Sequence, residues 1–146
     1  MSRVEQTISC LKEGFGCSQA ILSIYGTQFG LKREAALKLA EAFAGGMGRM
    51  GGTCGAVTSA LMVIGLKYGR TKAGDRESQK KTDSLVKELV DRFKSRNGSI
   101  LCRELLGNDI GTPEGMCIAR EKQLFATLCP RFVRDAAEIL EQLLEE

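Results

Sequence analysis

Six cysteines are the residues of this chain with the most chemistry to offer, and no histidine accompanies them. Without histidine, the chain cannot form a Cys₂His₂ zinc site, a Ser-His or Cys-His catalytic pair, or the C-x-x-C-H attachment site of a c-type haem. Successive cysteines are 7, 37, 48, 15 and 12 residues apart. Because no two form a C-x-x-C pair, a zinc ribbon is excluded, and any shared site requires the fold to gather distant cysteines.

Four of the six cysteines lie where helices are expected to begin. Cys17 follows a glycine, Cys54 follows a glycine-rich loop, Cys102 lies three residues after the expected N-cap Ser99, and Cys129 is itself a candidate N-cap. A helix N-terminus offers unpaired N–H donors and a partial positive charge, which both favour thiolate over thiol. Because thiolates attack disulfides and ligate iron or zinc, we predict that these four cysteines form a functional site.

A simpler interpretation applies to each cysteine taken alone. Cysteine is often buried as a small hydrophobic residue that fills gaps in a core. The coincidence of four cysteines at helix starts favours the functional interpretation for that set. Cys10, in the middle of a predicted helix, and Cys117, one turn into another, are interpreted as core or surface thiols.

The loop "GGMGRMGGTCG" at residues 45–55 is the second candidate feature. Gly46, Gly48 and Gly51 have the G-x-G-x-x-G spacing of a dinucleotide-binding loop. That fingerprint requires a preceding strand within a βαβ unit, whereas helical patterns flank this loop, so nucleotide binding is rejected. We interpret the loop as a collar that exposes the sulfur of Cys54 and allows a second sulfur, a metal or a substrate to approach.

Residues of this loop are therefore predicted to contact a cofactor: Gly48, Arg49, Gly51, Gly52 and Gly55. The glycine N–H groups would donate to the sulfurs, and Arg49 would offset the negative charge of a thiolate cluster, a role also open to Arg103. Gly45 and Gly46 could serve only as the C-cap of the preceding helix, but that would leave the other glycines unexplained.

Helical periodicity dominates the remaining sequence, and no strand pattern of period two is found. Helices are expected from apolar repeats or strong helix formers over residues 4–15, 17–26, 33–44, 54–68, 85–97 and 130–144. A short turn is expected at 99–107, and Thr112-Pro113 is a strong helix start. The expected fold is all-α, a single-domain bundle of about six to seven helices over residues 1–146.

The composition disfavours two classes of partner. The net charge is only +3, with no Trp and two Tyr, so a basic groove with aromatic platforms for nucleic acid is not expected. The N-terminus has no apolar leader and the longest apolar stretch is too short to span a bilayer, which predicts a cytoplasmic protein. Thiols are kept reduced in that compartment, so metal binding or redox chemistry is expected before structural disulfides.

The segments around the four cysteines resemble the C_GCAxxG_C_C family, to which a redox role is ascribed. They are "GCSQAIL", "GGMGRMGGTCGAVTSALMVIGLKYG", "CRELLG" and "CPRFVRDAAEIL". The resemblance runs from Cys17 to Leu140, and the signature cysteines of the family correspond to Cys17, Cys54, Cys102 and Cys129. One departure is Ser59, which stands where the family's CGAxxG ends in glycine.

This resemblance implies a helical redox domain similar to the non-haem domain of split-Soret cytochrome c. That domain belongs to a homodimer and is associated with an iron–sulfur type centre. The resemblance therefore implies a cysteine-bound iron centre and a homodimer for this chain. Its haem function is not implied, because the chain has no C-x-x-C-H segment.

Three functions follow as hypotheses. The leading one is an electron-transfer protein in which Cys17, Cys54, Cys102 and Cys129 bind an iron–sulfur cluster, with an electron-transfer partner that the sequence does not identify. The second is a metal-free thiol–disulfide redox protein in which Cys54 is the catalytic nucleophile. The third is a structural module that holds zinc in a Cys₄ site.

Overall fold

The computed structural model describes residues 1–145, which contain helices and no strand. Eight α-helices and one 3₁₀ helix lie within that range: α1 (Arg3–Lys12), α2 (Cys17–Tyr25), η1 (Gly26–Phe29), α3 (Arg33–Glu41), α4 (Gly55–Tyr68), α5 (Arg76–Asn97), α6 (Cys102–Leu106), α7 (Pro113–Glu121) and α8 (Leu124–Leu144). The predicted all-α class is therefore confirmed. The five-residue α6 is the segment that the sequence indicated as a short turn.

Several helix boundaries follow from local capping. Thr112 caps α7, since its Oγ1 accepts a hydrogen bond from the Gly115 N–H at 3.0 Å, and proline occupies the first position of that helix. Asp75 caps α5 in the same way, with Oδ1 accepting from the Ser78 N–H at 3.1 Å. Gly98 ends α5 in the left-handed conformation that glycine adopts readily. The predicted helix start at Thr112-Pro113 and the helix end at Asn97-Gly98 are confirmed.

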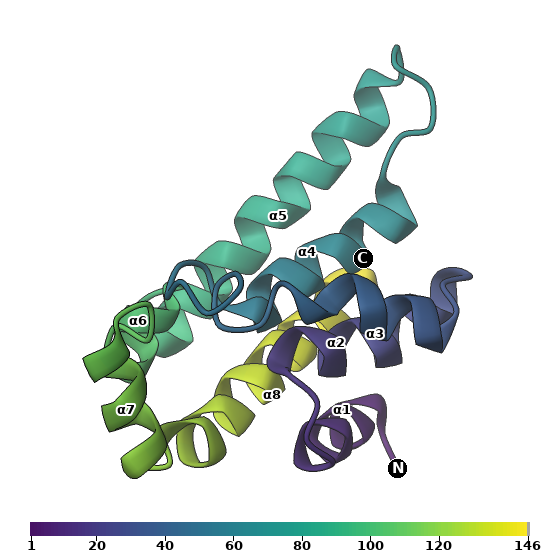
Figure 1. The fold of residues 1–146 in the computed structure, drawn as a ribbon. Coiled ribbons are helices and arrows are strands. Elements are labelled where there is room, and N and C mark those ends of the chain that lie inside the picture. The colour runs from purple at the N-terminus through teal and green to yellow at the C-terminus, as the bar shows by residue number, and fades with distance from the viewer. Residues whose placement is uncertain (146) are drawn as a thin grey trace.

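Helix α2 lies at the centre of the fold, in contact with α1, α3, α4 and α8. Figure 1 shows α8 crossing the molecule behind α2 and α4, while α5 runs antiparallel to α4 and its first turns project from the body. Ile21, Leu22 and Tyr25 of α2 are 0 to 1% exposed. Tyr25 also donates its hydroxyl proton to Glu141 Oε1 at 2.7 Å, which ties α2 to α8.

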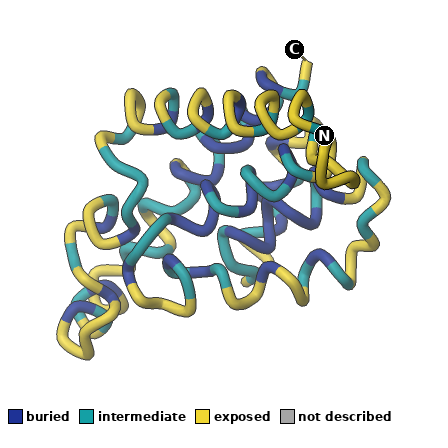
Figure 2. The backbone as a smooth tube through the Cα atoms, turned by 90° about the horizontal axis from the view of Figure 1, so that it is seen from above, coloured by how far each residue is buried: buried dark blue, intermediate teal, exposed yellow. Residues whose placement is uncertain are grey.

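Buried residues gather in the interior where these helices meet, and exposed residues follow the outer faces of the helices (Figure 2). Fully covering a leucine or isoleucine side chain stabilises a fold by about 1.5–3 kcal/mol, so this interface supplies most of the driving force. None of the helices described is long and apolar enough to cross a membrane.

Five expected boundaries are wrong. Helix α5 begins at Arg76, nine residues before the expected start, because Asp75 caps it there, and α1 ends at Lys12 rather than at residue 15. Helix α8 begins at Leu124, six residues before Pro130, because apolar residues of "LFATLC" pack on the core and carry the helix through the proline. Helix α3 ends at Glu41, before Gly45 and Gly46. Leu101, not Ser99, is the N-cap of α6; the Ser99 hydroxyl instead accepts from the Leu101 N–H at 2.9 Å.

The glycine loop is tightly folded on itself, and Gly46 marks the closest approach. Its φ is +60°, and a Cβ added there would lie 2.3 Å from the Gly52 carbonyl oxygen and 2.6 Å from that of Thr53. A side chain at this position would meet rigid backbone in addition to the strain of a left-handed conformation.

Replacing Gly46 by alanine is therefore expected to lower the free energy of unfolding by about 3 kcal/mol or more. Denaturant unfolding followed by circular dichroism measures this loss. Gly74→Ala is the matched control, because a Cβ at Gly74 would have nothing within 4 Å. Equal stability of the two variants would contradict this account of the loop.

Candidate functional site

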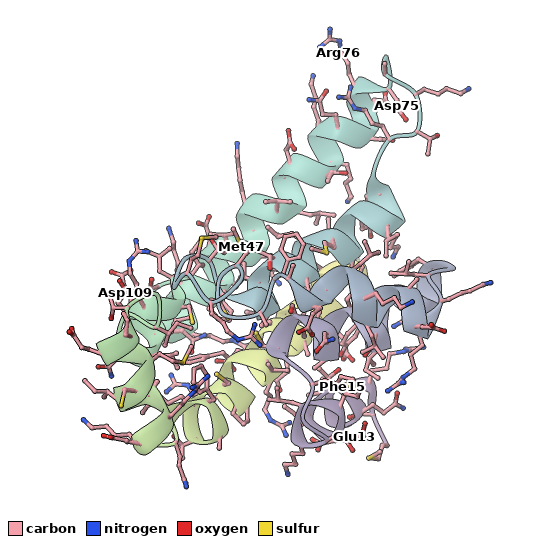
Figure 3. All side chains as sticks on the ribbon, viewed as in Figure 1. Glu13, Phe15, Met47, Asp75, Arg76 and Asp109 are labelled. Carbon is pink, nitrogen blue, oxygen red and sulfur yellow. The ribbon has the colours of Figure 1, made fainter. Side chains whose placement is uncertain are left out.

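The four predicted cysteines line one cavity of about 340 Å³. The cavity lies among the α1–α2 turn, the glycine loop, α6, α7 and the start of α8. Cys17, Cys54, Cys102 and Cys129 share it with an apolar wall made by Leu11, Phe15, Leu105, Leu106, Met116, Phe125 and Phe132. Figure 3 shows Phe15 between α1 and α2. The fold thus brings together cysteines that are as much as 112 residues apart (17 to 129).

Backbone hydrogen bonds between the glycine loop and the start of α6 fix Cys54 and Cys102 on either side of one short bridge. Thr53 and Leu101 form an isolated antiparallel bridge. The Cys54 N–H donates to the Ile100 carbonyl at 2.7 Å, and the Cys102 N–H donates to the Gly52 carbonyl at 2.6 Å. The two cysteines therefore lie on paired segments that the sequence separates by 48 residues.

Cys17 approaches this pair at the first residue of α4, Gly55, which has no side chain to block it. It is the first residue of α2, after the N-cap Gly16. A Cβ built on Gly55 would lie 2.7 Å from Cys17 Sγ and 2.8 Å from the Phe43 carbonyl oxygen. Glycine at position 55 is therefore what allows the Cys17 sulfur to reach Cys54.

The surroundings of Cys17 favour its thiolate. A hydrogen bond from the Cys54 thiol is the largest influence and lowers the pKa of Cys17 to about 7, against the opposing effect of burial. The backbone N–H groups of Gly45, Ser18 and Ala56 also donate to the Cys17 sulfur. Ser18 and Ala56 are second residues of α2 and α4, so unpaired donors at two helix N-termini converge on one sulfur.

The other three cysteines are held as thiols. The pKa of Cys54 lies well above its usual value, because Cys54 donates to Cys17 and is buried beside the negative charge of Cys17. Burial raises the pKa of Cys102 to about 11 and that of Cys129 to about 12, with further contributions from the charge on Cys17. The pKa of Cys17 is therefore lowered and that of Cys54 raised, while the role of Cys54 as nucleophile stays a prediction.

Cys129 does not lie at a helix start, contrary to the sequence-based expectation. It lies inside α8 rather than at its N-cap, so its own backbone N–H belongs to the helix interior. Its side chain enters the cavity from the flank of the helix, and no backbone donor acts on its sulfur. Cys129 thus lines the cavity, although it is not the N-cap that the sequence analysis expected.

The glycine loop contributes to the cavity through residues only partly anticipated. Arg49 and Gly55 line it, and so does Gly45, which the sequence analysis regarded as a possible helix cap. Gly48, Gly51 and Gly52 do not line it, and their N–H groups donate to the carbonyls of Ala42, Gly45 and Gly46. A role for those three glycines in binding a cofactor stays a prediction.

Arg103, the second predicted cation, donates to the Gly51 carbonyl at 3.3 Å and so braces the loop. Figure 3 shows Asp109 beside α6, and a Cβ on Gly51 would lie 2.7 Å from its carboxylate. The charge of Asp109 contributes to the raised pKa of Cys102.

Arg120, on α7, also lines the cavity, and the sequence analysis did not predict this. Only the tertiary structure brings this side chain to the cysteines.

Within the described part of the chain, no three Cys, Asp or Glu side chains form a group that could hold a metal ion. Four cysteines on one cavity have the right chemistry for zinc or an iron–sulfur cluster, but their arrangement does not fit a preformed metal site. All six cysteines are free thiols.

The remaining two cysteines match the secondary interpretation. Cys10 is buried with its sulfur 3.7 Å from the Ser23 hydroxyl, and Cys117 is exposed and donates to Glu121 at 3.5 Å.

Ser59, the departure from the family pattern, is fully buried and donates to the Gly55 carbonyl at 2.7 Å. Its hydroxyl is therefore satisfied inside α4 and does not disturb packing.

Comparison with known proteins agrees with the cysteine pattern. Residues 15–143 match the family described as "Putative redox-active protein (C_GCAxxG_C_C)". The chain belongs to this family. Comparisons with curated proteins and with solved structures gave no significant match.

Removing the Cys54 thiol should raise the pKa of Cys17, because the hydrogen bond from Cys54 is its largest stabilising influence. In the wild type, alkylation of Cys17 should accelerate as the pH rises through about 7 and then level off. Cys54→Ala should move this midpoint upward and slow alkylation at pH 7 by about 10-fold.

Cys54→Ser is the control, because a serine hydroxyl still donates a hydrogen bond and should keep part of the shift. Mass spectrometry of protein alkylated at a series of pH values identifies the modified residue and its rate. An unchanged midpoint in Cys54→Ala would show that the thiol does not stabilise the thiolate.

Proposed function

We propose that this protein is a thiol–disulfide redox protein in which Cys17 and Cys54 form the reactive pair. The observation that carries the proposal is that both cysteines line one cavity, with the Cys17 sulfur against the bare backbone of Gly55, the residue after Cys54. The influence of the Cys54 thiol, which lowers the pKa of Cys17, agrees with this arrangement. The family's ascribed redox role is consistent with this chemistry.

The reaction follows from the states of the two sulfurs. The Cys17 thiolate attacks one sulfur of a substrate disulfide, forms a mixed disulfide and releases the first substrate thiolate. Cys54 transfers its proton to that leaving thiolate and attacks Cys17, which forms the Cys17–Cys54 disulfide and releases the second thiolate. The protein gives up two electrons and the substrate disulfide accepts them; a dithiol reductant reverses the sequence.

The surrounding groups support each part of that exchange. Backbone donors from Ser18, Gly45 and Ala56 stabilise the attacking thiolate without adding a side-chain acid that would protonate it. Cys54 is only 6% exposed, so a large reagent reaches Cys17 first and Cys54 acts as the resolving thiol. This reverses the roles that follow from taking Cys54 as the nucleophile.

Mild oxidation of the reduced protein should produce a single disulfide between Cys17 and Cys54. Peptide mapping by mass spectrometry under non-reducing conditions identifies the bond. Cys17→Ser and Cys54→Ser should abolish it, while Cys117→Ser, which removes the exposed thiol outside the cavity, should leave it intact. A disulfide at other positions, or none at all, would refute the proposed pair.

An iron–sulfur cluster remains the second candidate, since all four family cysteines line one cavity. It requires the four side chains to rearrange from the positions described above, because they do not form a metal-binding group there. The same requirement applies to a Cys₄ zinc site.

Protein purified without oxygen distinguishes these candidates. A bound cluster would give visible absorbance together with stoichiometric iron and acid-labile sulfide. Bound zinc would give stoichiometric zinc without visible absorbance, iron or sulfide. Our primary proposal expects a colourless protein free of both metals that still undergoes the thiol exchange. Stoichiometric iron and sulfide that disappear in Cys102→Ser and Cys129→Ser would instead favour the cluster.

We further propose a cytoplasmic location and a homodimer. The six free thiols suit a reducing compartment. The dimer rests on the resemblance to the non-haem domain of split-Soret cytochrome c, and sedimentation equilibrium, with a monomer mass as the refuting result, tests it.

A further inference from the structure

The charged residues that line the cysteine cavity are all cations. Arg49 of the glycine loop and Arg120 of α7 are the only charged side chains among its lining residues, within the described part of the chain. Both are exposed, whereas Cys54 and Cys102 are buried, so the arginines lie toward the mouth and these sulfurs lie deeper. No salt bridge joins either arginine to a carboxylate among residues 1–145.

The backbone is arranged to direct Arg49 toward the cavity. Its φ is +66°, a left-handed conformation that a residue with a side chain seldom adopts, and Gln123 is the only other described non-glycine residue with positive φ. The Arg49 N–H donates to the Ala44 carbonyl at 3.1 Å, which closes the turn. Such a conformation persists only where surrounding contacts impose it, and it often accompanies a functional role.

Gly45 leaves room for the Arg49 side chain because it has no side chain of its own. A Cβ at Gly45 would lie 2.8 Å from both Cα and Cγ of Arg49, so the arginine stem lies directly against the bare glycine backbone. Gly45 is also one of the donors to the Cys17 sulfur. The loop therefore holds a cation, Arg49, in contact with Gly45, whose N–H acts on the Cys17 sulfur.

The remaining wall is apolar and the space is limited. Phe15, Phe125 and Phe132 contribute rings, and Leu105 and Met116 contribute aliphatic surface. A volume of about 340 Å³ is at the lower end of the range typical of small-molecule sites. Such a cavity fits an extended small disulfide better than the bulk of a folded protein.

We propose that the substrate is a small-molecule disulfide that carries carboxylate groups, with Arg49 and Arg120 pairing with those carboxylates while the apolar wall holds the chain that leads to the sulfurs. This inference rests on the proposed thiol–disulfide function and specifies its substrate class. Arginine is suited to this role because its planar guanidinium binds carboxylates through two parallel hydrogen bonds.

Three dialkyl disulfides of similar size and different charge test the proposal: 3,3′-dithiodipropionate is anionic, bis(2-hydroxyethyl) disulfide is neutral and cystamine is cationic. The rate of mixed-disulfide formation at Cys17 is measured with each, by mass spectrometry of quenched samples. Because each protein variant is compared with the wild type for one probe at a time, differences in intrinsic disulfide reactivity cancel.

The double substitution Arg49→Gln with Arg120→Gln should slow the anionic probe by about 10-fold or more, since paired cations steer and retain anions. The neutral probe should react at the wild-type rate, which shows that Cys17 itself is unchanged, and the cationic probe should react at the same rate or faster. High salt should slow only the anionic probe in the wild type.

Arg76→Gln is the matched control, because Arg76 lies at the far tip of α5 (Figure 3) and does not line the cavity. It should leave all three rates unchanged. Circular dichroism of each variant confirms that the helices are retained.

Equal slowing of all three probes, or no slowing of any, would overturn the assignment of an anionic substrate. The Cys17–Cys54 disulfide would still form in that case, so the proposed function would survive. If no probe reacts at Cys17 of the wild-type protein, the proposed function fails and this inference fails with it.

Discussion

The contact between the Cys17 and Cys54 sulfurs depends on the absence of one methyl group. A Cβ at Gly55 would lie 2.7 Å from Cys17 Sγ, so any other residue would push the sulfur away or distort the start of α4. With glycine there, the Cys17 sulfur can lie near three groups that lower its pKa: the Cys54 thiol and the backbone N–H groups at the starts of α2 and α4. The asymmetry between a thiolate and a thiol, on which the proposed chemistry depends, follows from this close approach.

The glycine loop links this contact to the rest of the fold. Its amides bond mainly to carbonyls nearby in the sequence, while Gly51 and Gly52 accept hydrogen bonds from the start of α6. Those bonds fix Cys102 and Cys54 on either side of one short bridge, and the turn that contains Gly45 presents Arg49 at the cavity mouth. A loop that resembles a nucleotide-binding motif in sequence therefore uses its glycines to fold compactly.

The proposed reaction and the proposed substrate use the two ends of the same cavity. Burial raises the pKa of Cys102 to about 11 and that of Cys129 to about 12, so in the proposed reaction these thiols compete poorly with Cys17 as nucleophiles. At the mouth, two exposed arginines line the same cavity as the sulfurs. A low-dielectric interior strengthens electrostatic effects on the thiolate, while exposed cations act mainly on an approaching anion.

The sequence by itself determined the helical class, most helix positions and the four cysteines, because periodicity and capping are local properties. It predicted correctly that Cys17 and Cys54 stand at helix starts, but it placed Cys129 at an N-cap where α8 in fact runs through Pro130. Only the tertiary structure brings donors from two helix starts to the Cys17 sulfur and places Arg120 on the cavity wall. Those properties depend on contacts between segments remote in the chain and on burial, neither of which any local pattern encodes.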